Sequence, residues 1–415
     1  MDILLFEDAA VSQLDPIAIG KPAFAIMCGG RRLLEIVSPI GNLHAHVRSH
    51  LRQLVAADYP SVSLAGNFGD GPLLAVNARL APSLSNARTL TDLAAQGRPT
   101  VVRCGGVIAA AVLAADATGK LERCDEPIDR ALASLGSMPC DLPLSLFDFP
   151  HDVLRHHLSC FGENLAAAIE RGEYRQTSDG VFFAEGASLG SYVTTDTSKG
   201  PIVLEAGATV GPYCYLRGPI HLGPGTRVLE QSVLKDGVAT GHTVKIGGEV
   251  EASIIEPFTN KQHHGFLGHS YLGSWINLGA GTCNSDLKNT YGTVNMEYRG
   301  RKVSTGMQFV GAIIGDYAKT AINTGIFTGK TVGACSMVYG FVTTNVPSFV
   351  NYARLFGQVT EAPVEVMVST QRRMFARRGV EQRPCDIQLL HDMHALTTHE
   401  RQALGESLSI EPLSL

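Results

Sequence analysis

Aliphatic residues recur at every sixth position through the middle of the chain. Over three runs, the positions in phase are Leu204, Val210, Leu216, Leu222, Val228, Leu234, Ile246, Leu272, Leu278, Ile314, Ile326, Val332 and Val338. An α-helix repeats after about 3.6 residues and a strand after about two, so neither produces this spacing. A period of six is typical of a parallel β-helix of triangular section, in which three hexapeptides close one coil around a shared apolar core. The pattern therefore predicts a hexapeptide-repeat β-helix over residues 179–345.

A polar segment interrupts this repeat between Cys283 and Phe309. It opens with residues 284–289, Asn-Ser-Asp-Leu-Lys-Asn. A loop can leave a coil without disturbing the stack, and functional groups of repeat proteins concentrate in such insertions. We expect the insertion to carry part of the functional site, the alternative being a solvated decoration.

Apolar strand candidates alternate with helical segments in the first 150 residues. The expected strands cover residues 3–6, 23–27, 61–64, 73–76 and 101–102, and the apolar residues of segment 43–57 have helical spacing. Such alternation predicts an α/β domain with a mainly parallel sheet over residues 1–150. Beyond it we expect a linker helix within residues 151–178. The hexapeptide phase is lost at Pro347, and a helical C-terminal tail is expected over residues 346–415.

Charge and cysteine content restrict the class of partner and the compartment. Lys and Arg number 34 against 39 Asp and Glu, a net charge of −5, so the chain has no basic excess for nucleic acid or an anionic membrane. No apolar run is long enough to span a bilayer, and the nine cysteines lack any C-x-x-C pair. We expect a cytoplasmic protein that acts on small molecules.

Three histidines and a lysine lie within the ten residues 260–269, as His263, His264, His269 and Lys261. A neutral imidazole can take a proton from an attacking amine, as acyl transfer requires. Zinc binding by these histidines is the alternative, but no Asp or Glu lies next to this segment in the sequence to orient the imidazole rings. We therefore expect a general base and no metal. Solvent-exposed surface histidines are the remaining alternative.

The residues around this segment carry a family resemblance. His263 ahead of Leu267 and Gly268, followed by residues 277–284, resembles the acetyltransferase half of the bifunctional N-acetylglucosamine-1-phosphate uridyltransferase/glucosamine-1-phosphate acetyltransferase family. The opening residues 3–8, with Pro22 and residues 29–33, are similar to the variant nucleotidyltransferase-like domain of an alternative bacterial branch of that family. The fold that this resemblance implies is an α/β nucleotidyltransferase-like domain, a left-handed parallel β-helix and a helical tail.

The resemblance also implies roles for residues of the β-helix. His263 takes the position of the catalytic base. The residues implied to contact the acceptor sugar, its phosphate or the coenzyme are Asn277, Asn284, Lys288 and Lys261. Ile322 and Gly340 are implied to hold acetyl-CoA along the coil groove. Lys319, Arg372, Arg377 and Arg378 are candidates for its phosphates, because Lys and Arg are the usual partners of phosphate; a solvated helix face is the alternative for the three arginines. The sequence departs from the family at two positions that concern the acceptor. Phe266 stands where the family has a tyrosine, and Glu251 stands where it has a lysine. Lys261 would take the role of that lysine.

The N-terminal nucleotide site is less complete. Gly29, Gly30 and Arg31 supply the glycines and the cation of a phosphate-binding loop without the full motif. Mg²⁺ needs a carboxylate at a strand end, yet the expected strand at 73–76 ends in Asn77, and Asp70 lies before it. Mg²⁺ is therefore expected only if this domain is active. A degenerate, structural or sugar-binding role is the alternative.

Together these features predict an enzyme of nucleotide-sugar synthesis that acetylates an amino-sugar phosphate from acetyl-CoA. The first domain is expected to have a second activity, as a sugar-1-phosphate nucleotidyltransferase, if it uses a nucleoside triphosphate. A homotrimer is expected, because the coenzyme groove of the resembled family lies between subunits. The alternatives are a non-catalytic trimeric sugar-binding or scaffold protein and a zinc-dependent β-helix enzyme.

Overall fold

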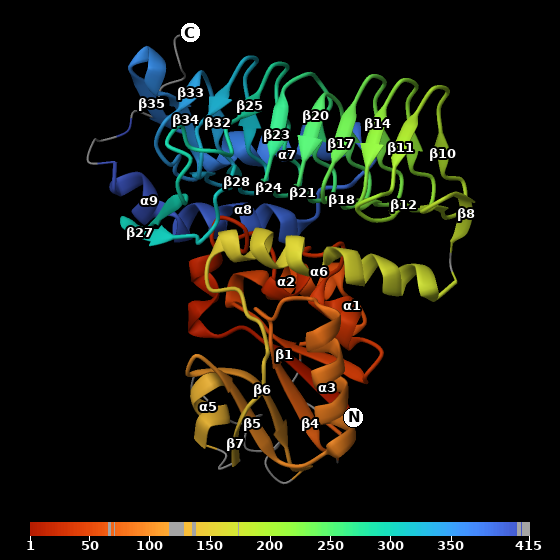
Figure 1. Cartoon of the computed structure of the whole chain (residues 1–415). Coiled ribbons are helices and arrows are strands. Elements are labelled where there is room, and N and C mark those ends of the chain that lie inside the picture. The colour runs from red at the N-terminus through yellow and green to blue at the C-terminus, as the bar shows by residue number, and fades with distance from the viewer. Residues whose placement is uncertain are drawn as a thin grey trace. The chain divides into compact units, whose positions relative to one another are not determined.

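The chain divides into two compact units. The first contains residues 1–14 and 18–149, and the second contains residues 15–17 and 150–415. They are called the N-terminal unit and the β-helix unit below (Figure 1). The computed structural model describes residues 1–64, 68–69, 71–115, 128–134, 138–172, 174–404 and 408.

A seven-stranded sheet forms the centre of the N-terminal unit, in the order β3-β2-β1-β4-β6-β5-β7. The strands are β1 (Asp2–Phe6), β2 (Asn42–His46), β3 (Val62–Ser63), β4 (Leu73–Asn77), β5 (Thr100–Cys104), β6 (Val107–Leu113) and β7 (Met138–Asp141). Strand β6 is antiparallel to both neighbours, and the other pairs are parallel. The α-helices are α1 (Leu33–Val37), α2 (Arg52–Asp58), α3 (Leu84–Gln96) and α5 (Ile128–Ser134). The predicted α/β class of this part is thereby confirmed.

Two local predictions in this unit are wrong. Residues 23–27 were expected as a strand, but Ala23–Ala25 is a short 3₁₀ helix after Pro22, and the Ala23 N–H donates to Glu7 Oε1 over 2.9 Å. This run is apolar because it is buried throughout, and burial alone does not make a strand. Segment 43–57 was expected as one helix. It begins as β2 and becomes α-helical only at Arg52, because the buried strand residues, such as Leu43, fall by chance at helical spacing from the apolar residues of α2.

Short parallel strands stacked in three faces build the β-helix unit, drawn in green to blue in Figure 1. Residues one coil apart pair directly, such as Leu204 with Leu222 and Leu216 with Leu234. The side chains in phase point into one core, and Leu204, Leu216 and Leu222 are each 0% exposed. This stacking confirms the hexapeptide interpretation.

Each face has its own set of strands. The first face consists of β10 (Ser188–Leu189), β13 (Thr209–Val210), β16 (Arg227–Val228), β19 (Lys245–Ile246), β22 (Asn260–Lys261), β29 (Lys319–Thr320), β32 (Met337–Val338), β34 (Val350–Ala353) and β35 (Gln358–Glu361). The second consists of β11 (Thr194–Asp196), β14 (Tyr215–Arg217), β17 (Val233–Lys235), β20 (Glu249–Glu251), β23 (Phe266–Gly268), β25 (Cys283–Asn284), β30 (Gly325–Ile326) and β33 (Phe341–Val342). The third consists of β8 (Arg175–Ser178), β9 (Val181–Phe183), β12 (Ile202–Leu204), β15 (Ile220–Leu222), β18 (Val238–Thr240), β21 (Ile254–Ile255), β24 (Tyr271–Leu272), β28 (Ala312–Ile314) and β31 (Lys330–Val332).

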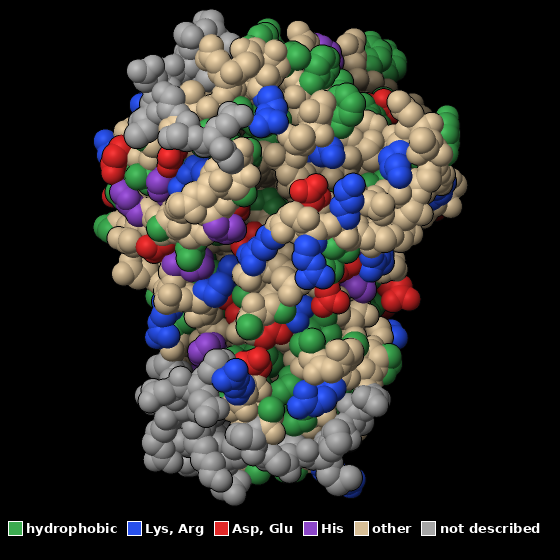
Figure 2. All heavy atoms as spheres, turned by 90° about the vertical axis from the view of Figure 1, so that its left-hand side faces the viewer, with side chains coloured by type: hydrophobic (Ala, Val, Ile, Leu, Met, Phe, Trp, Pro, Cys, Tyr) green, Lys and Arg blue, Asp and Glu red, His purple; other side chains and the backbone are tan. Residues whose placement is uncertain are grey.

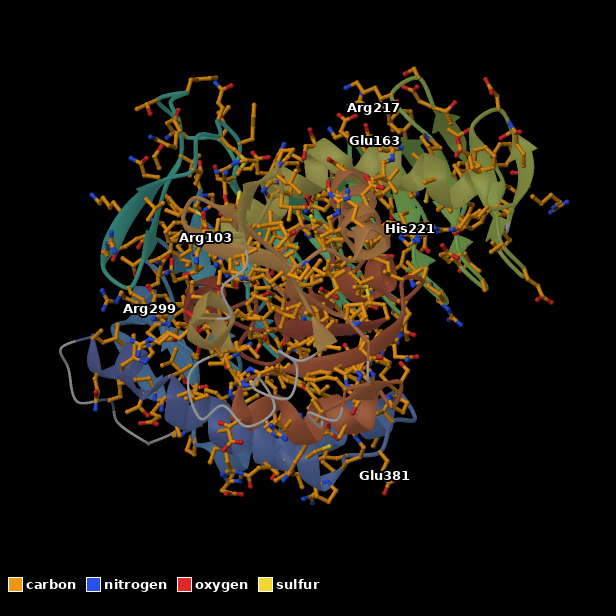
Figure 3. The ribbon with its side chains drawn as sticks, turned by 90° about the horizontal axis from the view of Figure 1, so that it is seen from below. Arg103, Glu163, Arg217, His221, Arg299 and Glu381 are labelled. Carbon is orange, nitrogen blue, oxygen red and sulfur yellow. The ribbon has the colours of Figure 1, made fainter. Side chains whose placement is uncertain are left out.

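Helices and one hairpin complete this unit. Helix α6 (Pro150–Glu170) precedes the coils, and its Phe161 and Leu165 pack with Val203 and Ala239 of the third face. The insertion forms an antiparallel hairpin of β26 (Asn295–Tyr298) and β27 (Arg301–Ser304). In Figure 3 this hairpin, with Arg299 at its turn, projects away from the coils that carry Arg217 and His221. Helices α7 (Val364–Arg377), α8 (Pro384–Leu396) and α9 (Thr398–Gln402) end the described chain, so the predicted helical tail is present.

On the face drawn in Figure 2, the Lys and Arg side chains are interspersed with Asp and Glu, so this face has no patch of a single charge. Within the described ranges, no helix combines the length and the apolar content needed to cross a membrane.

Candidate functional site

The histidine segment spans two corners of one coil. Strand β22 ends at Lys261, residues 262–265 turn the first corner, and β23 ends at Gly268, just before His269 at the next corner. His263 and His264 are both exposed at the first corner. The only described hydrogen bond of the His263 ring comes from Gln262 Nε2, over 3.2 Å. The structure therefore leaves His263 accessible to solvent without a carboxylate to orient its ring.

Lys261 lies inside the coil. Its side chain points inward, the residue is 2% exposed, and Nζ donates to the carbonyl oxygens of Gly247 and His263 at 2.9 Å and 2.7 Å. Burial lowers the pKa of Lys261 to about 8, because the charged ammonium is poorly solvated there. These contacts fix the backbone of the corner that presents His263. They do not direct the ammonium toward a bound phosphate.

His269 forms a pair with Asp286 of the insertion. Asp286 Oδ2 accepts from His269 Nδ1 over 2.8 Å, and the two side chains are 16% and 14% exposed. The imidazole stacks on the Phe309 ring with centroids 5.1 Å apart. Gly268 has to lack a side chain here, because a Cβ would overlap Asp286 Oδ2 and the ring of Phe266. The coil and the insertion thus build one half-buried cluster.

Sequence reasoning missed this pair. It looked for a carboxylate beside the histidines along the chain, but Asp286 is 17 residues after His269. One coil is 18 residues, as in the pairing of Leu216 with Leu234, so a residue about 18 positions away is a spatial neighbour. That spacing is the signal that could have identified Asp286.

Two of the predicted contact residues occupy structural positions. Asn284 is 5% exposed, accepts from the Gly268 N–H over 2.9 Å and donates to the Gly268 carbonyl over 3.0 Å. It anchors the start of the insertion directly beside the His269–Asp286 pair. Lys288 donates to the Thr293 carbonyl over 2.9 Å within the insertion. The structure therefore brings Asn284, but not the Lys288 ammonium, to this cluster.

A pocket between the first face and α7 gathers other predicted residues. Its lining consists of Phe258, Asn260, Trp275, Ile276, Asn277, Lys319, Met374, Arg377 and Arg378. The rings of Phe258 and Trp275 stack at 4.1 Å between centroids, which provides a flat aromatic wall. The pocket lining contains three cations and no carboxylate. Arg372 lies on the same helix but outside this lining.

The two arginines of the pocket repel each other, and Lys319 is buried beside them. Burial, followed by the charges of Arg377 and Arg227, lowers the pKa of Arg378, whose Nη2 donates to Asn260 Oδ1 over 2.6 Å. Burial also lowers the pKa of Lys319 to about 8, and its Nζ donates to the Tyr317 carbonyl over 3.0 Å. Uncompensated positive charge favours an anion, and the aromatic wall favours a planar ring system beside it.

Ile322 and Gly340 occupy successive turns of one corner, between the first and second faces. The side chain of Ile322 is 70% exposed, and Gly340 has a φ of 77°. Other exposed apolar side chains lie at this corner in the first two coils and at the second face in the last coils. We call this set the apolar ridge; its members are Tyr192, Tyr213, Ile322, Phe327 and Phe341.

The glycine pair of the N-terminal unit forms a tight turn. Gly29 and Gly30 have φ angles of 59° and 70°, and Cys28 and Arg31 exchange backbone hydrogen bonds of 2.9 Å and 3.1 Å across them. A left-handed conformation at two consecutive residues explains why both are glycine.

Ion pairs occupy the two carboxylates that follow β1, Glu7 and Asp8. Asp8 accepts from Arg79 Nε and Nη2 at 2.9 Å and 2.7 Å, and from Asn77 Nδ2 at 2.8 Å. Glu7 accepts from the Arg48 side chain over 3.0 Å and 3.2 Å. Mg²⁺ needs carboxylate oxygens that are open to an octahedral shell. The described carboxylates do not fit that ion, and Asp70 lies outside the described residues. Nowhere in the described ranges do three His, Cys, Asp or Glu side chains form a group that could hold a metal.

Comparisons with known proteins agree with this architecture. Residues 3–171 match the sequence model of the sugar nucleotidyl transferase family. The chain is 28% identical over 169 residues to a bifunctional sugar-1-phosphate nucleotidylyltransferase/acetyltransferase of Sulfurisphaera tokodaii, covering 40% of this chain and 42% of that protein. It is 31% identical over 162 residues to the bifunctional protein GlmU of Alkalilimnicola ehrlichii, covering 34% of this chain and 32% of that protein. The chain therefore spans less than half the length of these curated relatives.

Among solved structures, the UDP-N-acetylglucosamine acyltransferase of Francisella novicida is similar at 14% identity and a TM-score of 0.31, over 54% of this chain and 76% of that chain. The resemblance read from His263, residues 277–284 and the opening strand is confirmed by the family match and the curated relatives. Residues 3–171 thus resemble the sugar nucleotidyl transferase family, and parts of the chain are similar to bifunctional sugar nucleotidyltransferase/acetyltransferases.

Proposed function

We propose that this protein is an enzyme of nucleotide-sugar synthesis that transfers the acetyl group of acetyl-CoA to the amine of an amino-sugar phosphate such as glucosamine 1-phosphate. The observation that carries the proposal is the cation-lined, aromatic-walled pocket on a hexapeptide β-helix that also presents a histidine cluster. The relatives named as bifunctional nucleotidylyltransferase/acetyltransferases support the same class of reaction.

The reaction needs a nucleophile, a proton acceptor and a leaving thiol. The neutral amine attacks the thioester carbonyl, the new C–N bond forms, the C–S bond breaks, and the thiol leaves after it has taken up a proton. A histidine near neutral pH can accept the amine proton and return it to sulfur. His263 is the base that the family resemblance implies, and His269 is the other histidine of the cluster.

The pocket suits the nucleotide end of the coenzyme. The adenine would lie against the Phe258–Trp275 wall, and Lys319, Arg377 and Arg378 would hold the phosphates. Ile322 and Gly340 would line the path of the pantetheine arm, as the resemblance implies.

Replacing Lys319 or Arg378 by Met should raise the KM for acetyl-CoA about 10-fold or more, because each change removes a charge-assisted hydrogen bond to phosphate. Arg372→Met is the matched control, because Arg372 is on the same helix outside the pocket lining. A KM that stays unchanged in both pocket variants would contradict this coenzyme site.

The family match of residues 3–171 favours a second function, transfer of a nucleotidyl group to the sugar 1-phosphate with release of pyrophosphate. No step through Mg²⁺ is assigned to Asp8 or Glu7, because arginines occupy both carboxylates. Pyrophosphate release from each nucleoside triphosphate and N-acetylglucosamine 1-phosphate tests this function separately from acetyl transfer.

A homotrimer is proposed on the basis of the apolar ridge. Ile322, Phe327 and Phe341 are 70%, 51% and 51% exposed in the single chain, and exposed apolar side chains gathered at the second face of the last coils suit burial against further copies of the chain. Phe341→Glu should dissociate the trimer, whereas Val366→Glu should not, because Val366 is exposed on α7 away from the ridge. Sedimentation velocity measures the outcome. A monomeric wild-type protein at micromolar concentration would contradict the proposal.

The acetyl-transfer proposal is tested by following thiol release from acetyl-CoA in the presence of a series of amino-sugar phosphates. Release that depends on the amine supports it, and a complete absence of release with the whole series would overturn it.

A further inference from the structure

We propose that Arg227 and Lys245, beside the pocket on the first face, bind the 3′-phosphate of CoA and so select CoA against ligands that carry only its diphosphate. The inference rests on the coenzyme site of the proposed function and names the part of the coenzyme that this surface recognises. Neither residue belongs to the pocket lining, and the family resemblance assigns no role to either.

The two residues extend an outward-facing column of the first face. Arg227 pairs with Lys245 on the next coil, and Lys245 pairs with Asn260. Asn260, Asn277 and Lys319 then follow in the same column, and all three line the pocket. The residue that comes next in each of β16 and β19 is buried in the core, so the two cations point out of the coil. They therefore continue the wall of the pocket along the coils.

Helix α7 adds two arginines to the same stretch of the face. It has 14 residues, a length of about 21 Å, and it begins shortly after β35 at the last coil. Neighbouring coils are about 4.8 Å apart, so the helix runs back over about four of them. Its end is fixed at the coil next to that of Lys245, because Arg378 Nη2 donates to Asn260 Oδ1 over 2.6 Å. Arg377 and Arg378 thus join the pocket to the two further cations.

The protein does not neutralise this positive charge. Burial lowers the pKa of Lys245, and the charges of the three neighbouring arginines lower it further. Among the residues that the structure describes, no carboxylate forms an ion pair with Arg227, Lys245 or the two arginines of α7. Like charges directly opposite on paired strands destabilise a sheet, and Arg227 and Lys245 are such a pair. A bound anion removes this repulsion, so the arrangement favours an anionic ligand.

The position of these cations suits a ligand with phosphates at two places. Lys245 lies three strand steps from Lys319, about 14 Å between the backbones. CoA carries a diphosphate on one side of its ribose and a separate phosphate on the ribose 3′-oxygen. With the adenine against the Phe258–Trp275 wall, the diphosphate faces Lys319 and the 3′-phosphate faces Lys245. The phosphate of the amino sugar is the competing occupant, and continuity with the pocket through Arg378 favours the coenzyme.

Calorimetric titration of the full chain with CoA and with dephospho-CoA tests the proposal, because the second ligand lacks only the 3′-phosphate. A salt concentration of about 0.15 M screens exposed charges more than about 8 Å apart. Wild type should bind CoA about 10-fold or more tightly than dephospho-CoA. Arg227→Met and Lys245→Met should each weaken CoA binding by about 10-fold, because a charge-assisted hydrogen bond is lost, and should change dephospho-CoA binding by less than about 3-fold.

Both variants should fold, because each replaces an outward-facing side chain and leaves the core intact. Arg372→Met is the matched control, since Arg372 is exposed on α7 outside the pocket lining, and it should leave both affinities unchanged. A preference for CoA that is lost in the two variants and kept in the control supports the proposal. Equal binding of both ligands by wild type, or equal losses for both ligands in the variants, overturns it while the coenzyme site stands.

Two further outcomes separate the proposal from its alternatives. The KM for glucosamine 1-phosphate should change by less than about 2-fold in Lys245→Met. A rise of about 10-fold in that KM, with unchanged preference for CoA, shows that the column holds the acceptor phosphate and overturns the proposal. Absence of binding of either ligand to wild type overturns the coenzyme site of the proposed function itself.

Discussion

Acidification should weaken the β-helix unit through His157 of α6. The residue is 0% exposed, its Nε2–H donates to the Gly237 carbonyl over 2.9 Å, and its ring lies 4.6 Å from that of Phe161. Burial lowers the pKa of His157 from 6.5 to about 4, because the imidazolium would lose its solvation there. The native state therefore holds this ring neutral in a pH range where the unfolded chain protonates it.

The sign and size of the effect follow from linkage. The contribution of His157 is complete above the unfolded pKa of 6.5 and is lost as pH falls toward 4. A shift of about 2.5 pKa units corresponds to about 3 kcal/mol in total, of which roughly 2.5 kcal/mol is lost by pH 4.5. His157→Gln removes the titrating ring, so the stability difference between wild type and variant should shrink by that amount between pH 7.5 and pH 4.5.

Urea unfolding provides the assay, because Trp275 is the single tryptophan of the chain and lies in the β-helix unit. Its fluorescence reports this unit, and all other titrating groups are common to both proteins and cancel in the difference. A wild-type-minus-variant free energy of unfolding that stays constant between the two pH values would refute the reasoning.

Three further predictions concern the core, the ion pairs and the pocket. Leu216→Asp should prevent folding of the β-helix unit, since Leu216 is 0% exposed and an unpaired carboxylate would enter the core, and circular dichroism would detect this. Arg79→Met should destabilise the N-terminal unit by about 3 to 5 kcal/mol in thermal or urea unfolding, because Asp8 loses its buried partner, and adding Asp8→Asn should recover part of the loss. The KM for acetyl-CoA should rise as pH passes about 8, where Lys319 loses its charge, and Lys319→Met should abolish that rise.

The hexapeptide period made the β-helix predictable, because each coil repeats the same inward position and the register needs no long-range information. The class of the N-terminal unit was predictable for a similar reason, since alternation of strands and helices is a local signal. The prediction of individual strands and helices failed where a segment is buried on all sides. Residues 23–27 are apolar because of packing around a 3₁₀ helix, and no local pattern distinguishes that from a strand.

The candidate site was less accessible to sequence reasoning, because its contacts join separate coils. Asp286 reaches His269 only through the stack, and the inward direction of Lys261 depends on which face β22 occupies. Phosphate binding by the cationic residues of the tail could be predicted from their residue type. The pocket that Arg377 and Arg378 form with Lys319 could not be predicted, because it depends on how α7 packs on the first face. The roles of His263, Asn277 and Gly340 remain predictions from resemblance.

The central claim is acetyl transfer to an amino-sugar phosphate, and one paired measurement tests it most directly. Thiol release from acetyl-CoA is followed with glucosamine 1-phosphate and, as the matched control, with N-acetylglucosamine 1-phosphate, which has the same sugar and phosphate but no free amine. The account predicts rapid release of one thiol per N-acetyl group formed with the first sugar and only background hydrolysis with the second. Equal release with both sugars, or none with any amino-sugar phosphate, would contradict it.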